Sequence, residues 1–439
     1  MKMKPTILAA VSVLGLAVVL SRQHVFSAPA SVPGAEAVAD FTGLSNGLVD
    51  DATHINVDQV NFEEVEHLAD GLGPLFNLDR CVACHQNPIT GGSSQVTELR
   101  AGHREHGKFV AATVTIAQGA DRITDRSLIN DRAICPNAQF PDAEITERVS
   151  DRENVRTSRL SLSLLGDGLV ESVPDADLRD IARRQCAGKN GVCGEIVEVP
   201  ILEAPSHTEV GRFGWKDQHR SLLSFSADAY LNEMGITNTL QPQEVTKICN
   251  PPNIPEPNSV ADTTGLADID RFARFIRATR APARGSITAQ VDHGAQIFAT
   301  IGCAECHVPS LKTASTGTPI NGGTFTVPAA LGGLVFHPFG DFLLHNIGTG
   351  DGVVQTQTEH FGRAYVGEWK GYSQSTANKM RTTPLWGLRL RTRLMHDGAS
   401  LTLRGAIARH RNEAEHARVA FDKLGSADQA AVLAFLGSL

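Results

Sequence analysis

The chain has 439 residues, of which 41% are hydrophobic and 20% are charged. These values are typical of a globular protein with two or three core-forming units, and they exclude a disordered or membrane-embedded chain. The formal net charge is −8, and loss of the first 30 residues, which hold three cations (Lys2, Lys4 and Arg22) and no anion, moves it to −11. A chain this acidic is not expected to bind nucleic acid.

The N-terminus has the pattern of an export signal. Lys2 and Lys4 precede a short apolar run over residues 7–20, and Ala28-Pro29-Ala30 offers a small-residue cleavage site. We therefore predict a signal peptide over residues 1–30 and a bacterial protein that is periplasmic or secreted, and not integral to the membrane after cleavage. An uncleaved N-terminal anchor is the alternative. Residues 31–57 are small and polar and are expected to form an extended arm.

Residues 58–283 are expected to form the first domain. An amphipathic helix is predicted from Asp58 and ends at Gly71-Leu72-Gly73, before the sequence Cys81-Val82-Ala83-Cys84-His85. The polar stretch after His85 is typical of irregular or short-stranded structure. Farther on, the sequence predicts a helix after Pro174, a strand over 197–202, helices over 221–234 and 267–279, and an extended proline-rich loop over 250–258.

Residues 286–439 are expected to form the second domain. Apolar residues at helical spacing from Val291 to Ile301 predict a helix that leads into Cys303-Ala304-Glu305-Cys306-His307. Helices are also predicted over 401–416 and from Ser426, which forms a capping box with Gln429. Because a helix leads into each Cys-x-x-Cys-His sequence, we predict a mainly α fold of two cytochrome c-like domains. Loop-rich and short-strand insertions enlarge the N-terminal one.

The two Cys-x-x-Cys-His sequences are the attachment signature of c-type haem. Random placement of 8 Cys and 16 His in 439 residues gives roughly 0.005 matches to this pattern, and the chain has two. In each, the two thiols can bond to the haem vinyl groups and the histidine can bind the iron as its proximal ligand. We therefore predict two covalent haems, one on Cys81, Cys84 and His85 and the other on Cys303, Cys306 and His307.

Four cysteines lie outside these motifs: Cys135, Cys186, Cys193 and Cys249. An even number in an oxidising compartment predicts two disulfides, for which three pairings are open. Cys186 and Cys193 flank a turn-like Gly-Lys-Asn-Gly sequence. We favour a bond between these two, which leaves Cys135 to pair with Cys249.

Several strings are similar to those of a known family. They are Gly211-Arg212-Phe213-Gly214-Trp215-Lys216, Glu233-Met234-Gly235-Ile236-Thr237, Arg381-Thr382-Thr383-Pro384-Leu385-Trp386-Gly387-Leu388 and His396-Asp397-Gly398. From about Leu72 to the C-terminus the chain resembles the di-haem c-type oxidoreductases known as thiol oxidoreductases. That group is distantly similar to bacterial di-haem cytochrome c peroxidases and to the di-haem enzyme that matures methylamine dehydrogenase. The resemblance implies two cytochrome c domains, with one haem relaying electrons and the other meeting peroxide or another oxidant. It is weakest between His85 and Arg152.

For the haem on His307, His410 is the predicted distal ligand. Leu403, Ile407 and His410 fall on one apolar face of the helix predicted over 401–416. The resemblance adds to this, because the related peroxidases have a methionine fourteen residues after the His-Asp-Gly histidine, where this chain has His410. A histidine there implies a lower reduction potential. Met395 is a rival ligand, and His396 is expected to bond a propionate or orient its loop.

For the haem on His85 the sequence leaves the distal ligand open. Met234 is a soft ligand of the right type, and His103, His106 and His219 are the other candidates. Core packing is the alternative for Met234. Four arginines could pair with haem propionates, with a solvated surface as the alternative: Arg381, Arg389, Arg391 and Arg393. Two tryptophans, Trp215 and Trp386, could relay electrons between the haems, with ordinary packing as the alternative.

The sequence thus predicts an exported di-haem c-type oxidoreductase, peroxidase-like, and assigns it no catalytic residue. Electrons would come from a small donor protein or a quinone-linked cytochrome and pass to a small oxidant such as peroxide. Because His307 has the better-defined distal ligand, we expect its haem to relay electrons and any substrate chemistry to occur at His85. The alternatives are a pure electron-transfer cytochrome with two six-coordinate haems, or a haem-based redox sensor. A Ca²⁺ ion between the domains is a further expectation.

Overall fold

The computed structural model describes residues 34–135, 140–249, 264–356, 359, 361 and 372–439. The predicted signal peptide and the proline-rich loop lie outside these residues. From Val32 to Leu439 the contacts form one unit, so the division into two cytochrome c-like domains stays a prediction. Among the described residues, no helix has the length and apolar character needed to cross a membrane.

The structure mixes helices with strands, being 33% helical and 18% strand, so the prediction of a mainly α fold is wrong. The helices are α1 Asp51–Thr53, α2 Gln59–Glu63, α3 Asp142–Ile145, α4 Asp167–Glu171, α5 Asp175–Cys186, α6 Leu222–Met234, α7 Asp268–Ala278, α8 Ala289–Thr300, α10 Leu403–Ala408, α11 Glu415–Asp422 and α12 Ser426–Leu436, with a π-helix at His54–Asp58. The strands are β1 Ala35–Glu36, β2 Leu75–Phe76, β3 Thr97–Glu105, β4 Lys108–Ala111, β5 Val114–Ile116, β6 Asp121–Ile123, β7 Leu128–Ile129, β8 Arg132–Ala133, β9 Val155–Leu160, β10 Glu198–Ile201, β11 Ala204–Val210, β12 Leu311–Lys312, β13 Pro319–Ile320, β14 Phe325–Thr326, β15 Leu334–Phe336, β16 Leu344–His345 and β17 Met380–Arg381.

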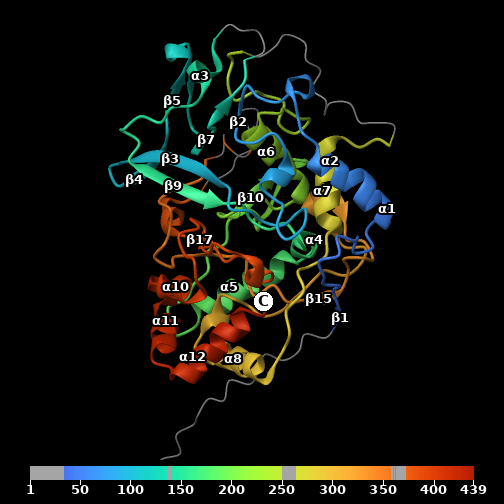
Figure 1. The fold of residues 1–439 in the computed structure, drawn as a ribbon, viewed down its shortest axis with the longest axis vertical. Coiled ribbons are helices and arrows are strands. Elements are labelled where there is room, and N and C mark those ends of the chain that lie inside the picture. Colours follow the sequence, from blue (N-terminus) through green and yellow to red (C-terminus); the bar gives the residue numbers. More distant parts are fainter. Residues whose placement is uncertain (1–33, 136–139, 250–263, 357–358, 360, 362–371) are drawn as a thin grey trace, which may run out of the picture. The chain divides into compact units, whose positions relative to one another are not determined.

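The largest sheet lies in the polar stretch that follows the first haem motif (Figure 1). Its central strand β3 pairs antiparallel with β4, β7 and β9, and Thr97 lies opposite Leu160. In β4, Phe109 and Ala111 are buried while Lys108 and Val110 between them are exposed. This alternation is typical of a sheet with one buried face. The sequence predicts irregular or short-stranded structure in this polar stretch. Strands form there, and two of their charged side chains, Arg100 and Arg159, are buried.

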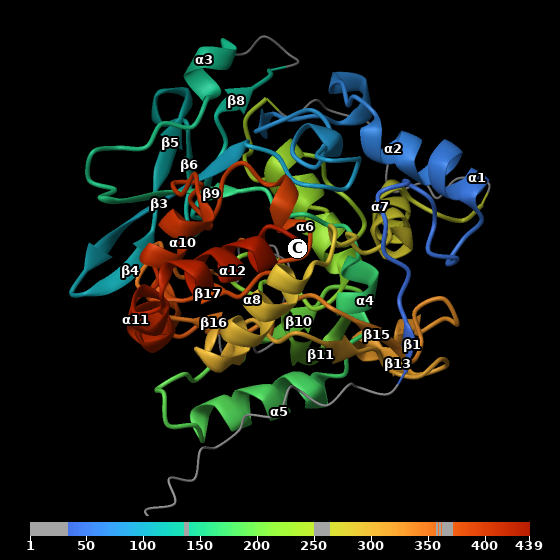
Figure 2. The same ribbon diagram turned by 60° about the horizontal axis from the view of Figure 1, so that its bottom comes forward.

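The helices around the first motif carry much of the main core. α6 packs against α7, and α2 lies against α7 on the other side (Figure 2). In α7 the predicted inward face is confirmed, since Ile269, Phe272, Phe275 and Ile276 are all buried. The helix predicted from Asp58 instead begins at Asp51, inside the expected arm, and α2 ends at Glu63. The strand β2, rather than a helix, directly precedes Cys81.

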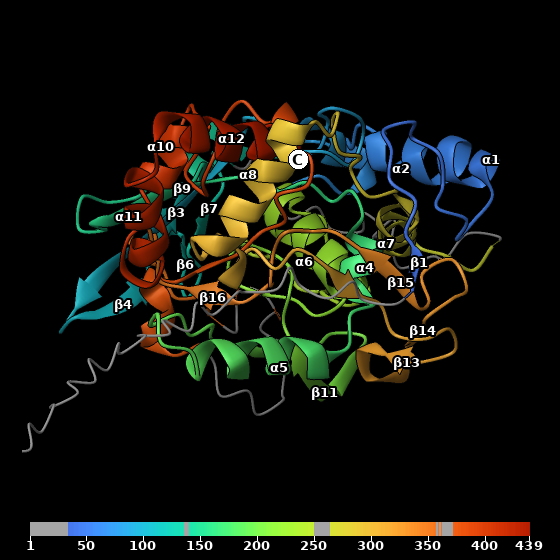
Figure 3. The same cartoon turned by 90° about the horizontal axis from the view of Figure 1, so that it is seen from below.

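The last helices gather around the second motif, with α8 beside α12 (Figures 1 and 3). Gly294 of α8 makes this approach possible, because a Cβ atom there would lie 1.9 Å from the carbonyl oxygen of Ala431. The helix predicted over 401–416 is interrupted, with α10 ending at Ala408 and α11 beginning at Glu415. The capping box is also wrong, because Gly425 is the N-cap of α12 and Gln429 donates to the carbonyl of Phe421.

Both disulfides form with the favoured pairing. Cys186 is bonded to Cys193, and Cys135 is bonded to Cys249 across 114 positions of sequence. The remaining four cysteines, all in the two haem motifs, are free thiols. The four cysteines that form no disulfide are therefore the four that are predicted to bond haem.

Candidate haem sites

The two Cys-x-x-Cys-His motifs adopt the same local structure. Each begins with a 3₁₀ turn, over Cys81–Ala83 and Cys303–Glu305. In each, the histidine N–H donates to the carbonyl of the first cysteine, at 3.1 Å for His85 and 3.0 Å for His307. The turn gathers both thiols and the imidazole on one short loop. That is the arrangement a covalently attached haem needs.

His307 is held in the state that an iron ligand requires. Its Nδ1 lies 3.1 Å from the carbonyl oxygen of Phe339, so Nδ1 carries the proton and Nε2 keeps its lone pair. Burial lowers the pKa of His307 to about 4, which keeps the ring neutral. A neutral imidazole with a fixed Nδ1–H is the usual form of a metal-binding histidine.

His410 faces His307 across the cavity, and its binding to an iron stays a prediction. The two ring centroids are 6.5 Å apart. Metal–imidazole bonds of about 2.0 Å place the centroids of two imidazoles on opposite sides of one iron roughly 6 Å apart. Nδ1 of His410 donates to the carbonyl of Ala406 at 2.9 Å, and burial lowers the pKa of His410. The pair fits a single iron between two nitrogen ligands.

The local structure at His410 differs from the prediction. α10 ends at Ala408 with Arg409 as C-cap, so His410 follows the helix and does not lie on its face. Its N–H donates to the carbonyl of Ile407, which continues the chain in a tight turn. The turn and the bond to Ala406, rather than helical periodicity, aim the imidazole at His307.

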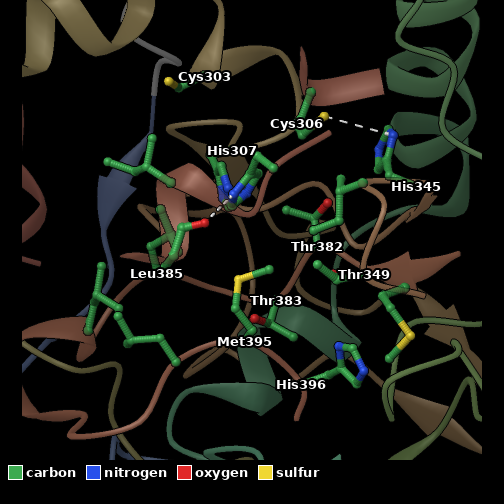
Figure 4. A pocket seen from close by; sticks show the side chains of 18 of the residues that line it. Cys303, Cys306, His307, His345, Thr349, Thr382, Thr383, Leu385, Met395 and His396 are labelled. Atoms are coloured by element: carbon green, nitrogen blue, oxygen red, sulfur yellow. Dashed lines mark hydrogen bonds between the residues drawn. The ribbon is translucent and has the colours of Figure 1, made fainter. Parts of the chain in front are cut away.

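The cavity around His307 and His410 has a volume of about 200 Å³. Cys303, Cys306 and His307 line it together with Met395 and His396 (Figure 4). Met395 therefore shares the cavity, as expected of a rival ligand. Burial lowers the pKa of His396 to about 4, and its ring meets Trp215 edge-on at 6.1 Å. The neighbouring Asp397 pairs instead with Arg409.

Three of the four candidate arginines line this cavity: Arg381, Arg391 and Arg393. Arg391 makes no ion pair with a carboxylate of the described residues, and burial lowers its pKa to about 10. A half-buried guanidinium that makes no ion pair suits the carboxylates of haem propionates. Arg389 lies elsewhere, over the ring of Phe41.

A charged cluster at the edge of the cavity was not predicted. His345 lies between Asp341 and Glu413, at 2.9 Å and 2.8 Å. Its Nδ1 is 3.8 Å from Sγ of Cys306 (Figure 4). Although burial opposes the charge, Asp341 raises the pKa of His345 well above its ordinary value. A cation is thus fixed beside a haem-attachment cysteine. No sequence signal marks it, since Asp341, His345 and Glu413 are not part of a motif.

His85 is prepared in the same way as His307. Its Nδ1 donates to the carbonyl of Leu162 at 2.8 Å, which leaves Nε2 for a metal, and burial lowers its pKa. Two adjoining cavities contain Cys84 and His85, and the first of them also contains Cys81. Phe225, Ala229 and Glu233 of α6 line both. The first motif therefore also has a cavity beside its imidazole.

A pair of carboxyl groups, also not predicted, lines the His85 cavity. Burial and the neighbouring Glu98 raise the pKa of Glu233 well above its ordinary value, and Asn77 donates to Glu233 at 2.7 Å. Burial opposes ionisation of Glu98 as well, but Arg100 bonds both of its oxygens, at 2.7 and 2.8 Å, and lowers its pKa. Of these two carboxyl groups, Glu233 is therefore the one that favours the protonated form, and Glu98 the one that favours the ionised form.

Of the candidate distal ligands for this haem, the structure brings only Met234 to the cavity among the described residues. His103 is bonded to Glu153 on the β3 sheet, and His106 lies in the turn between β3 and β4. His219 is buried beside Asp228 and does not line either cavity. Ligation by Met234 stays a prediction, because its side chain is also part of the main apolar core.

Trp215 stands between the two haem cavities. Four residues line both the His307 cavity and the larger His85 cavity: Leu160, Ser161, Leu162 and Trp215. The indole N–H of Trp215 donates to the carbonyl of Leu160 at 2.7 Å, which fixes the ring in this wall. Trp386, the other tryptophan considered, packs against Phe336 in the core and lines neither.

Each Cys-x-x-Cys-His loop lines a separate cavity and carries a neutral imidazole. These features place the protein in the class that holds two haems. The chain belongs to the di-haem oxidoreductase family. The family model described as "Di-haem oxidoreductase, putative peroxidase" matches residues 136–439, which include the second motif and His410. Membership of this family implies two haems and an oxidoreductase activity.

Similarity to individual proteins is low. Among solved structures, hydrazine synthase of Kuenenia stuttgartiensis aligns with 13% identity and a TM-score of 0.37 over 99% of this chain and 100% of that one. A MauG-like protein associated with microbial copper homeostasis aligns with 17% identity and a TM-score of 0.24 over 40% of this chain and 54% of that one. No curated protein matches the sequence.

Proposed function

We propose that this protein is an exported di-haem c-type oxidoreductase that reduces peroxide. Cys81 and Cys84 hold one haem with His85 as its proximal ligand, and the equivalent residues of the second motif hold the other. The haems supply one-electron storage at iron and, where a coordination position is open, the reduction of peroxide. The two haems would lie in two cytochrome c-like domains.

The observation that carries this proposal is the difference between the two sites. In the second, His410 lies opposite His307 at the spacing of two ligands on one iron, which suits electron relay. In the first, the described lining offers Glu233, whose pKa is raised, next to Glu98, whose pKa is lowered. Reduction of H₂O₂ to two waters takes up two electrons and two protons. A buried acid with a neighbouring carboxylate is suited to supplying protons.

The residues of the first cavity also offer a route for replacing the proton. Glu98 keeps 18% of its side chain exposed, while the side chain of Arg100 that holds it is only 5% exposed. A proton lost from Glu233 can therefore be replaced through Glu98. Arg100 also pairs with the buried Glu359, so the carboxylates stay in position while the proton moves.

Electrons would cross the wall that the cavities share. Trp215 lines both sides of it and is held by its bond to Leu160. The physiological reductant would be a small donor protein or a quinone-linked cytochrome. The acidic chain and the predicted signal peptide agree with a partner outside the cytoplasm.

The test is an EPR study of the purified protein, oxidised and half-reduced, with and without peroxide, after a pyridine haemochrome assay. We expect two c-type haems per chain, one low-spin haem in every state, and a second whose signal changes on half-reduction and on addition of peroxide. Fewer than two c-type haems would contradict the premise. Two haems that stay low-spin and do not react with peroxide would contradict the peroxidase.

One observation favours a second candidate function, a pure electron-transfer cytochrome. Met234 lines the His85 cavity and could occupy the sixth position of that haem permanently. A Met234→Leu variant separates the two functions. A change of the His85 haem from low-spin to high-spin in the variant would favour the cytochrome, whereas an unchanged spectrum would favour the oxidoreductase.

A further inference from the structure

A separate cavity of about 370 Å³ lies behind the loop that follows His85. It shares no lining residue with the two cavities that contain His85. Ile89 and Thr90 of the loop, Leu165 and Phe275 form part of its wall. A cavity of this size with apolar walls and a few polar groups is the usual form of a small-molecule site.

His54 is the polar group of this cavity that has no partner. It is 2% exposed, and its Nδ1 makes no hydrogen bond. A buried polar nitrogen without a partner is unfavourable unless a ligand or water bonds it. His54 opens the π-helix His54–Asp58, a type of irregularity that is frequent at functional sites. Burial lowers the pKa of His54, although Asp58 opposes this, so the ring is neutral and one nitrogen is an acceptor.

The charged and polar neighbours of His54 are already satisfied within the protein. Arg280 pairs with Asp40 and donates to the carbonyl of Ser45 at 2.9 Å. Gln59 and Thr90 both donate to Glu63. A charged ligand would have to break one of these contacts, so the cavity suits an uncharged one.

Aromatic rings form the wall between this cavity and the haem loop. Phe275 stacks on His54, with centroids 5.0 Å apart and ring planes 12° from parallel. Phe62 is 4.8 Å from Phe275 and 6.3 Å from His85. A flat ligand against Phe275 would thus be separated from the imidazole of His85 by two phenyl rings.

We propose that this cavity binds a small uncharged aromatic molecule with a hydroxyl group, a simple phenol. The ring packs against Phe275 and Leu165, and the hydroxyl donates to the ring nitrogen of His54. This gives the neutral imidazole the partner that the protein does not supply. The site is distinct from the haem cavities and goes beyond the proposed function, and it does not depend on peroxide reduction.

The test is a calorimetric titration of the haem-loaded protein with three probes: 4-methylphenol, toluene and benzoate. We expect 4-methylphenol to bind about tenfold more tightly than toluene, which lacks the donor, and benzoate not to bind. In a His54→Phe variant the preference for 4-methylphenol over toluene disappears, because the ring is kept and the acceptor is lost. A His54→Gln variant, which keeps an acceptor, retains part of the preference for 4-methylphenol. The matched control His293→Phe, at an exposed histidine of α8, keeps the full preference.

Three results would overturn the proposal. They are no binding of 4-methylphenol, equal affinity for 4-methylphenol and toluene in the wild-type protein, and a preference that survives in His54→Phe. Saturating cyanide, which occupies an open haem iron, should leave the binding of 4-methylphenol unchanged. Displacement by cyanide would place the phenol at a haem and refute this site. None of these measurements uses peroxide. A result that contradicts the phenol site can therefore be distinguished from one that contradicts the peroxidase function.

Discussion

Replacement of His410 by methionine is the sharpest test of the relay haem. The imidazoles of His307 and His410 have centroids 6.5 Å apart, close to the roughly 6 Å expected for two imidazoles on one iron. A methionine keeps a ligand at this position but exchanges a nitrogen for a thioether, which raises the potential of haem iron. We expect the midpoint potential of one haem to rise by roughly 0.1–0.2 V, a fraction of the ~0.8 V range that axial ligands span. The other haem should not change.

The measurement is a spectroelectrochemical titration of both haems, accompanied by EPR. His410→Ala should convert the same haem to high spin, because the ligand is lost without a substitute. The control is Met395→Leu, which removes the rival ligand from the same cavity and should leave the potential and the spin state unchanged. If His410→Met moves neither potential while Met395→Leu does, the reasoning from the paired imidazoles is refuted and Met395 is the ligand.

Four further predictions concern folding, pH and electron transfer. Loss of the Cys135–Cys249 disulfide by double substitution to alanine should lower the free energy of unfolding by about 4.8 kcal/mol, and loss of Cys186–Cys193 by about 2.4 kcal/mol, because the loops span 114 and 7 positions. Denaturant midpoints measure this, and the reverse order would contradict it. Burial raises the pKa of Glu66 from 4.5 to about 7, so between these pH values the folded chain binds more protons than the unfolded chain, and its stability falls as pH rises. Glu66→Gln should flatten that part of the stability profile, and an unchanged slope would show that another group titrates there. Gly294→Ala should destabilise the protein by about 1–3 kcal/mol because α8 must move from α12, whereas Gly285→Ala, whose Cβ would make only ordinary van der Waals contacts, should not; equal thermal shifts would refute this. Trp215→Phe should slow electron transfer between the haems in stopped-flow experiments without moving either midpoint potential, and an unchanged rate would exclude Trp215 as the relay.

The sequence predicts well those features that local chemistry determines. The haem motifs, both disulfides and the inward face of α7 depend on residues close in the chain or on the pairing of few cysteines. The position of His410 was also predicted, but for a reason that does not hold. The residue follows α10, and a turn at Arg409, rather than the face of a helix, directs its ring.

The parts that the sequence does not predict are set by contacts between distant segments. Glu98 lies on β3 and Glu233 on α6, and neither is unusual in its own stretch of sequence. Their opposite pKa shifts arise only because folding brings the two carboxyl groups together, with Arg100 bonded to Glu98. The cluster of Asp341, His345 and Glu413 likewise joins segments about 70 positions apart. The segment of the β3 sheet was predicted only as irregular or short-stranded, because charged residues such as Arg100 and Arg159, which folding buries, interrupt the apolar pattern.

Residues of three of the four strings behind the family resemblance meet at the wall between the cavities. The carbonyl of Trp215 accepts the N–H of Arg381 at 2.9 Å, and Arg381 in turn donates to the carbonyl of Arg212 at 2.8 Å. His396 is joined to the same wall, because its carbonyl accepts the N–H of Leu160 at 2.7 Å.

Lys216 holds this wall from the other side. Its ammonium group is fully buried, pairs with Asp351 at 3.0 Å, and donates to the carbonyl oxygens of Thr376, Ala377 and Lys379. Burying a charge is costly unless every donor finds an acceptor, and here the acceptors are backbone atoms of the segment that leads into β17. The charged residues of these strings therefore support the wall and fix Trp215 between the two cavities. This role explains why charged residues such as Arg212, Lys216 and Arg381 are buried in the wall.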